Sequence, residues 1–178
     1  RFFKEILKGA ADGGCTTYVM HGKPFFKKNV NSFKIDIQNI ADNMNKLCDI
    51  AGKYGVKIAL ENVHWAMCNN IDFINEINFK VPMLRYTLDI KQAHLSGTHW
   101  QEYISAFGSR LANVHICDYI GKNTCLPGRG EVDFTKLKAS LDDIGYSGNE
   151  IVEVYERDYK DFEDLKKSVD FCKGFFRG

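Results

Sequence analysis

Short apolar runs alternate with longer segments of helical periodicity, and this alternation constrains the fold more than any other feature of the sequence. The runs are rich in β-branched and aromatic residues, which favours strands over Thr16–His21, Val56–Glu61, Leu84–Asp89, Leu111–Ile116 and Glu150–Val154. Apolar residues at three- and four-residue spacing predict helices over Phe2–Ala11, Asn31–Tyr54, Ile71–Asn78, Trp100–Phe107, Phe134–Ile144 and Asp161–Phe175. Alternating strands and helices are typical of a parallel sheet with crossover helices, so we predict an α/β fold.

The balance of charge argues against one class of partner. The 178-residue chain has 24 Lys and Arg against 23 Asp and Glu, a net charge of +1, whereas nucleic-acid-binding proteins usually show a basic excess. No apolar run is long enough to cross a bilayer. The sequence has three prolines and no low-complexity linker. We therefore predict a single domain over residues 1–178 that binds neither nucleic acid nor membrane.

The six cysteines are scattered along the chain and form no CxxC pair. This distribution is typical of reduced, partly buried thiols, and it differs from a disulfide framework or a zinc knuckle. We therefore expect a cytoplasmic protein.

Ionisable residues stand at or near the C-terminal ends of the last four predicted strands. They are Glu61, Asp89, His115 and Glu153, and His21 ends the first strand. In a (β/α)8 barrel these ends converge on one mouth. Each residue alone has an ordinary structural explanation, but four in succession predict a metal site. Carboxylates with one imidazole suit Mn²⁺, Mg²⁺, Co²⁺ or Zn²⁺.

The strand ends and the loop between them carry motifs of a known family. From about Thr17 onward, the chain resembles the xylose isomerase-like TIM barrels, which include sugar phosphate isomerases and epimerases and the related apurinic endonucleases. The motifs are Leu60-Glu61-Asn62, Leu88-Asp89, Val114-His115-Ile116-Cys117-Asp118, Pro127-Gly128-Arg129-Gly130 and Val152-Glu153. The run Asp89-Ile90-Lys91-Gln92-Ala93 is similar to the sugar isomerase branch.

The resemblance implies a divalent-metal-dependent sugar or sugar phosphate isomerase or epimerase. It implies that Glu61, Asp89, His115 and Glu153 bind one metal ion, and that Glu61 and Glu153 are the acid/base pair. Removing a proton next to a carbonyl creates an enediolate, whose charge a bound cation stabilises. Two carboxylates on opposite sides of the sugar carbon can take and return that proton.

Six further residues are candidates for substrate binding, each with a structural alternative. They are His21, His64, Trp65, Gln92, Asp118 and Arg129. His21 either contacts substrate or is satisfied by backbone, and Trp65 either stacks on a sugar ring or caps the barrel. Asp118 could instead fix the tautomer of His115. Arg129 could bind a phosphate or carboxylate through two hydrogen bonds, or be solvated.

The chain departs from the family pattern in length and at one position. A full barrel needs about 250 residues, so we predict an incomplete TIM (β/α)8 barrel with about five βα units that resemble strands four to eight. Either a second copy of the chain or a missing N-terminal segment would complete it. Many relatives have His where Gln92 stands, and Gln is a poor ligand for a second metal ion.

Three other functions stay open. One is a metal-dependent polyol dehydratase of the same fold. The second is an apurinic-endonuclease-like phosphodiesterase, which Gln92 and the near-neutral charge disfavour. The third is a degenerate barrel that binds a sugar without catalysis, which the intact ligand set disfavours and the missing strands favour.

Overall fold

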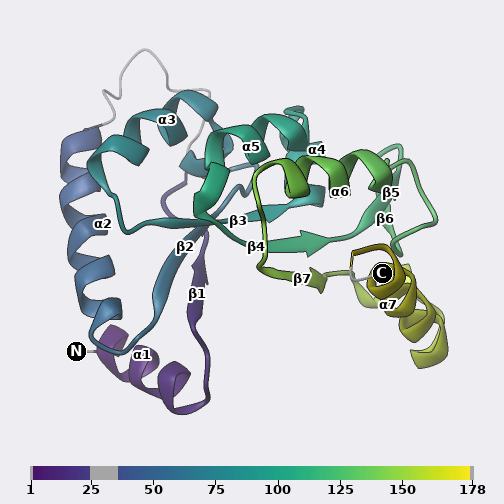
Figure 1. Cartoon of the computed structure of the whole chain (residues 1–178), viewed down its shortest axis with the longest axis horizontal. Helices are drawn as coiled ribbons and strands as arrows, with labels where there is room; N and C mark the ends of the chain where they lie inside the picture. The colour runs from purple at the N-terminus through teal and green to yellow at the C-terminus, as the bar shows by residue number, and fades with distance from the viewer. Residues whose placement is uncertain (1, 25–35, 177–178) are drawn as a thin grey trace.

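One parallel sheet organises the chain (Figure 1). The computed structural model describes residues 2–24 and 36–176. The strands lie in the order β1 (Thr17–Met20), β2 (Lys57–Glu61), β3 (Arg85–Asp89), β4 (Leu111–Ile116) and β7 (Asn149–Val152). Neighbouring strands are parallel throughout, so the C-terminal ends of all five strands lie at the same end of the sheet. The predicted α/β fold is confirmed, and the sheet is part of a (β/α)8 barrel.

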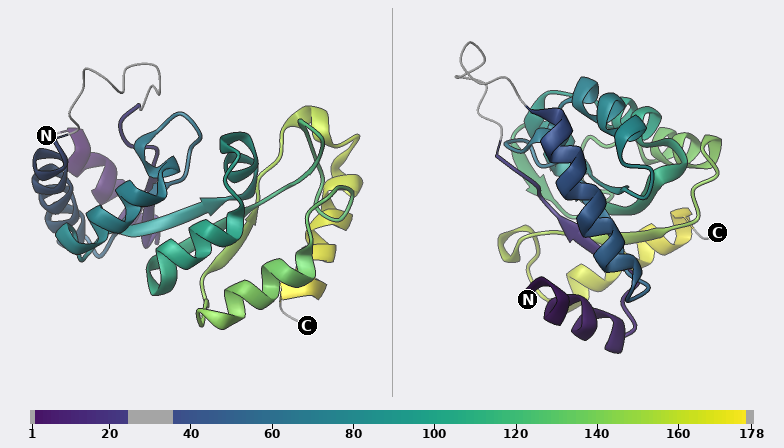
Figure 2. Two further views of the ribbon diagram at one scale, coloured as in Figure 1. Left: turned by 90° about the horizontal axis from the view of Figure 1, so that it is seen from above. Right: turned by 90° about the vertical axis from the view of Figure 1, so that its left-hand side faces the viewer.

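The helices form a layer along the sheet. Their bounds are α1 (Phe2–Asp12), α2 (Ile37–Gly52), α3 (Ile71–Lys80), α4 (Ile90–Ser96), α5 (Trp100–Phe107), α6 (Phe134–Asp143) and α7 (Phe162–Phe176). Contacts run from α1 to α2, α2 to α3, α3 to α5, α5 to α6 and α6 to α7, which gives the arc seen in Figure 2. None of the helices in the described part of the chain is long and apolar enough to cross a membrane.

Side-chain caps set where several helices begin. The carboxylate of Asp36 accepts a hydrogen bond from the backbone N–H of Asn39, and Asp133 caps α6 in the same way. A residue that caps a helix has non-helical backbone itself. The helix predicted over Asn31–Tyr54 therefore begins at Ile37, and residues 31–35 lie outside the described part of the chain.

The sequence interpretation missed two elements. Helix α4 follows β3 with no linker, because Asp89 both ends the strand and caps the helix, and Gly97 ends that helix with a φ of 74°. A two-stranded hairpin of β5 (Asp118–Ile120) and β6 (Asn123–Cys125) lies in the segment predicted as a loop. Short 3₁₀ turns occupy η2 (Met67–Asn69), η3 (Gly108–Arg110) and η4 (Glu156–Asp158).

The core lies between the sheet and the helices, and the sheet has two open edges. Tyr86 of β3 and Phe107 of α5 are fully or almost fully buried and stack with ring centroids 4.4 Å apart. Strands β1 and β7 are the edges, and in the described residues neither pairs with a further strand. On β7, Ile151 remains 45% exposed.

Candidate functional site

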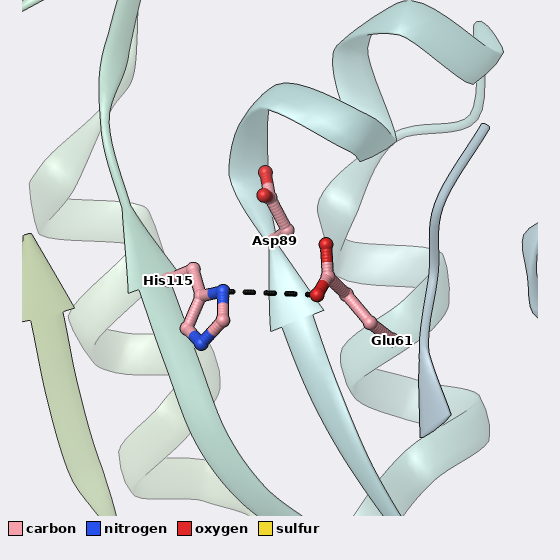
Figure 3. Close-up of side chains that lie close together, drawn as sticks. All are labelled: Glu61, Asp89 and His115. Carbon is pink, nitrogen blue, oxygen red and sulfur yellow. Dashed lines mark ion pairs between the residues drawn. The ribbon is translucent and has the colours of Figure 1, made fainter. Parts of the chain in front are cut away.

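Three predicted ligands meet at the C-terminal ends of three adjacent strands. Glu61 ends β2, Asp89 ends β3 and His115 lies near the end of β4. One ligand atom from each residue lies within 4.8 Å of the other two. Figure 3 shows the three side chains, with Glu61 Oε2 at 4.0 Å from His115 Nδ1. The parallel sheet alone brings these residues together, since they are 26 or more positions apart in sequence.

Burial decides the protonation behaviour of the two carboxylates in this group. It raises the pKa of Glu61 to about 7, and the neighbouring Asp89 carboxylate adds to the effect while His115 opposes it. Burial also raises the pKa of Asp89, against the opposing influence of Lys91. Bringing a cation into the site would remove this penalty, because the ionised carboxylates would gain a partner.

Two polar atoms of the group are buried without a hydrogen-bond partner among the described residues. They are Oδ2 of Asp89 and Nδ1 of His115, whereas Oδ1 of Asp89 accepts from the backbone N–H of Gln92 at 2.9 Å. Buried polar atoms nearly always have a hydrogen-bond partner, so these two atoms, which have ion-pair neighbours instead, need an explanation. Carboxylate oxygen and imidazole nitrogen are common ligands of divalent metals. The residues therefore fit a metal ion.

Glu153, the fourth predicted ligand, lies at the rim of this group. It follows β7, and its backbone N–H donates to the carbonyl of Ile116. Its Oε2 lies 2.5 Å from His115 Nδ1, an ion-pair distance without the direction of a hydrogen bond. The carboxylate is 45% exposed, in contrast to those of Glu61 and Asp89. Its role as a ligand stays a prediction.

Glu153 and His115 shift each other's protonation. Burial alone would lower the pKa of His115, but Glu153, Glu61 and Asp89 outweigh that effect, so the pKa is raised. The pKa of Glu153 is lowered, chiefly by His115 and against the effect of burial. The pair therefore favours an ionised Glu153 beside a protonatable imidazole.

Two of the predicted substrate residues stand beside Glu61. His21 Nε2 lies 3.7 Å from Glu61 Oε2, and the His21 ring meets the Trp65 ring edge to face with centroids 5.7 Å apart. Both side chains are exposed to solvent. They are placed where a solvent-borne ligand could reach them, and their role in substrate binding stays a prediction.

His64 and Gln92 are paired with each other. Gln92 Oε1 lies 3.1 Å from the backbone nitrogen of His64 and 2.7 Å from its Nδ1. Because an amide oxygen only accepts, Nδ1 of His64 must carry the proton. The pairing commits the oxygen of Gln92, and a contact of either residue with substrate stays a prediction.

Asn62, which the sequence interpretation left without a role, ties two of the ligand strands together. It is fully buried, donates to the carbonyl of Asp89 at 3.1 Å and accepts from the backbone N–H of Asp89 at 2.7 Å. This double hydrogen bond fixes the end of β3 against the end of β2. The family motif Leu60-Glu61-Asn62 contained the residue, but only the register of the strands reveals its partner.

Asp118 organises the backbone of the loop that follows β4. The side chain is fully buried, and its carboxylate accepts hydrogen bonds from the backbone N–H groups of Tyr119, Gly128, Gly130 and Val132. This carboxylate is committed to the loop and shielded from solvent, and its predicted contact with His115 or with substrate stays a prediction. Gly130 allows this approach, since a Cβ there would clash with Tyr119 O and Asp118 Oδ1.

Arg129 forms an ion pair with Asp164 of α7. Its two terminal nitrogens face the two oxygens of that carboxylate. This bidentate pair joins the Pro127–Gly130 loop to α7. The arginine is also half exposed, and its predicted contact with a phosphate or carboxylate of the substrate would require it to leave Asp164.

We expect Asp118→Asn to lower the free energy of unfolding by about 2–4 kcal/mol. An amide has one acceptor oxygen and places an N–H₂ group against backbone donors, which leaves buried N–H groups unpaired. Urea unfolding followed by circular dichroism measures the change. Asp143→Asn on the exposed surface of α6 is the matched control, with an expected change within about 0.5 kcal/mol. Equal stability of both variants would refute the role of Asp118.

The curated proteins that this chain resembles include sugar epimerases and isomerases. Fructoselysine 3-epimerase of Shigella flexneri is 26% identical over 122 residues, which cover 65% of this chain and 44% of that protein. Inosose isomerase of Bacillus subtilis (strain 168) is 31% identical over 132 residues, covering 66% and 47%. The chain spans about half the length of the curated relatives it matches.

Solved structures share the fold at lower sequence identity. A D-tagatose 3-epimerase-like protein superposes with a TM-score of 0.79 at 23% identity, over 98% of this chain and 67% of that one. The IOLI protein with a binding zinc atom has a TM-score of 0.77 at 23% identity, over 98% and 68%. The family model described as the xylose isomerase-like TIM barrel matches residues 1–175. By that match and by its half-barrel of parallel strands, the chain belongs to the xylose isomerase-like TIM barrel family.

Proposed function

We propose that this chain carries the metal-dependent proton-transfer centre of a sugar or sugar phosphate isomerase or epimerase. The observation that carries the proposal is the buried group of Glu61, Asp89 and His115, in which two polar atoms lack a hydrogen-bond partner among the described residues, with Glu153 beside it. The names of the relatives, fructoselysine 3-epimerase, inosose isomerase and D-psicose 3-epimerase, support the same class of reaction.

In this proposal Glu61, Asp89 and His115 hold one divalent cation, and Glu153 completes the set. When bound, such a cation polarises a substrate carbonyl and stabilises the negative charge formed as the adjacent carbon loses its proton. The described residues identify the donor atoms but leave the choice among Mn²⁺, Zn²⁺, Co²⁺ and Mg²⁺ open. The crystal structure of the IOLI protein with zinc supports a metal in this fold.

Glu61 and Glu153 are the proposed acid/base pair. Glu61 ends β2 and Glu153 follows β7, on opposite sides of the two strands between them. A sugar carbon above Asp89 and His115 would then have a carboxylate on each side. Proton removal by one carboxylate and return by the other inverts that carbon, whereas transfer along one face moves the carbonyl.

The alternatives differ in the product that they would give. A polyol dehydratase would release water, and a phosphodiesterase would nick abasic DNA. A degenerate barrel would bind sugar without proton exchange. We favour proton transfer over phosphodiester cleavage because Gln92, which stands where many relatives have a metal-binding His, has its oxygen committed to His64.

We also propose that additional βα units, from a longer chain or a second copy, cover the two sheet edges in solution. Parallel sheets are normally buried on both faces, and open edges promote association. We expect the 178-residue chain to self-associate, which light scattering coupled to size-exclusion chromatography measures. A well-folded, monodisperse monomer that unfolds cooperatively would refute the need for such a partner.

Metal binding should be stoichiometric and should weaken as pH falls. We expect about one equivalent of Mn²⁺ or Zn²⁺ by titration calorimetry and elemental analysis, with affinity falling about tenfold from pH 8 to pH 6, because Glu61 protonates below its pKa of about 7. Asp89→Asn should weaken binding at least about tenfold, since it removes a charged ligand but keeps the helix cap. Asp143→Asn should leave it unchanged. Absence of binding at any pH would reject the metal centre.

The proposed reaction is tested by hydrogen exchange at the sugar carbon. In D₂O with bound Mn²⁺, we expect ketoses such as D-tagatose, D-fructose and inososes to gain deuterium next to the carbonyl, as seen by NMR. Glu153→Gln should slow this at least about 100-fold, because general acid–base groups contribute that much. Glu150→Gln, in the same strand, is the control. Exchange at the wild-type rate in Glu153→Gln would remove Glu153 from the mechanism.

A further inference from the structure

Lys91 places a buried ammonium group against the candidate metal centre. It lies two residues after Asp89, in the first turn of α4, and its side chain is 8% exposed. Lysine is almost never this buried unless its charge is paired. The sequence run Asp89-Ile90-Lys91-Gln92-Ala93 contained it, but no role was assigned to it.

The ammonium group connects two of the predicted metal ligands. Nζ lies 3.5 Å from Asp89 Oδ2 and 3.6 Å from Glu153 Oε1. It also lies 4.8 Å from the ring centroid of Tyr155, two residues beyond Glu153. Asp89 ends β3 and Glu153 directly follows β7, and β4 lies between these two strands. Lys91 therefore connects Asp89, at the end of the inner strand β3, with Glu153, directly after the edge strand β7.

The same atoms are the ones a metal would use. Oδ2 of Asp89 is the buried oxygen that lacks a hydrogen-bond partner, because the approach of Lys91 is an ion pair without hydrogen-bond geometry. The other oxygen of Glu153 faces His115. Among residues 2–24 and 36–176, no other Lys or Arg forms an ion pair with Glu61, Asp89 or Glu153. Lys91 is therefore the permanent positive charge at this group of carboxylates.

We infer that Lys91 is a positioning residue that holds Glu153 beside His115 and, by sharing Asp89 and Glu153 with the cation, lowers the affinity of the centre for a divalent metal. The inference rests on the proposed function, because it assumes that the site binds metal. An ammonium group a few ångströms from a divalent cation repels it, and burial strengthens that repulsion. The ammonium group also restrains the half-exposed carboxylate of Glu153 through their ion pair.

The test compares Mn²⁺ affinity in Lys91→Met and Lys91→Arg with that of the wild-type chain. Methionine keeps the length and apolar character of the side chain but removes the charge, so we expect binding to tighten at least about tenfold. Lys91→Arg keeps the charge and should stay within about threefold of wild type. Lys46→Met, on the exposed surface of α2, should have no effect. Titration calorimetry gives affinity and stoichiometry, and circular dichroism confirms that each variant is folded.

A second measurement separates positioning from a general structural role. Glu153→Gln should weaken Mn²⁺ binding more in the Lys91→Met background than in the wild-type background, because Glu153 is then free to turn to the metal. Deuterium exchange at the sugar carbon should fall in Lys91→Met through kcat with KM unchanged, and Lys91→Arg should restore it. If Lys91→Met does not fold, Lys91→Gln replaces it in the same comparison.

The outcomes distinguish this inference from the proposed function. Tighter Mn²⁺ binding in the uncharged variant, with non-additivity toward Glu153→Gln, supports the role of Lys91. Unchanged or weaker binding in a folded Lys91→Met protein overturns it and leaves the metal centre intact. Failure of the wild-type chain itself to bind Mn²⁺ overturns the metal centre, and the inference with it.

Discussion

Three carboxylates and one imidazole share a small, largely buried volume where the parallel strands end, and the rest of the site is arranged around this concentration of negative charge. Burying ionised groups is unfavourable unless they gain partners. His21, His115 and Lys91 supply cationic or protonatable groups beside these carboxylates, and burial raises the pKa of Glu61 to about 7. A divalent cation, as proposed above, would offset the remaining charge, and we infer that the groups already present set its affinity.

The placement of these charged groups depends on hydrogen bonds made by Asn62, Gln92 and Asp118. Asn62 joins the ends of β2 and β3 through two bonds with the backbone of Asp89, and Gln92 is fixed between Asp89 and His64. Asp118 organises the loop beyond β4 through the backbone. None of these three residues belongs to the four predicted metal ligands. Their hydrogen bonds nevertheless keep the ends of β2 and β3, and the loop beyond β4, from moving independently.

The half-barrel explains why the carboxylates on the two sides of the site differ in solvent exposure. Glu61 and Asp89 end inner strands and are almost fully buried, whereas Glu153 follows an edge strand and stays half exposed. In a closed barrel the neighbouring strand would cover that edge. Lys91 forms an ion pair with Glu153 and lies over the ring of Tyr155, so this chain itself supplies a contact to Glu153 from the side of the inner strands.

The sequence by itself determined the parallel α/β sheet and its five strands, and it identified Glu61, Asp89, His115 and Glu153 at or near the strand ends. Both could be predicted because the alternation of apolar runs and the residues at strand ends are local patterns. The start of α2 was misplaced because Asp36 acts as a cap, and α4 was missed because Asp89 ends a strand and begins a helix with no linker. The partners of Asp118, Asn62 and Lys91 were decided by the tertiary structure alone. Asn62 contacts Asp89 on the neighbouring strand, Lys91 contacts Glu153 beyond β4, and Asp118 binds the backbone of the loop that returns to it, so no local pattern encodes these contacts.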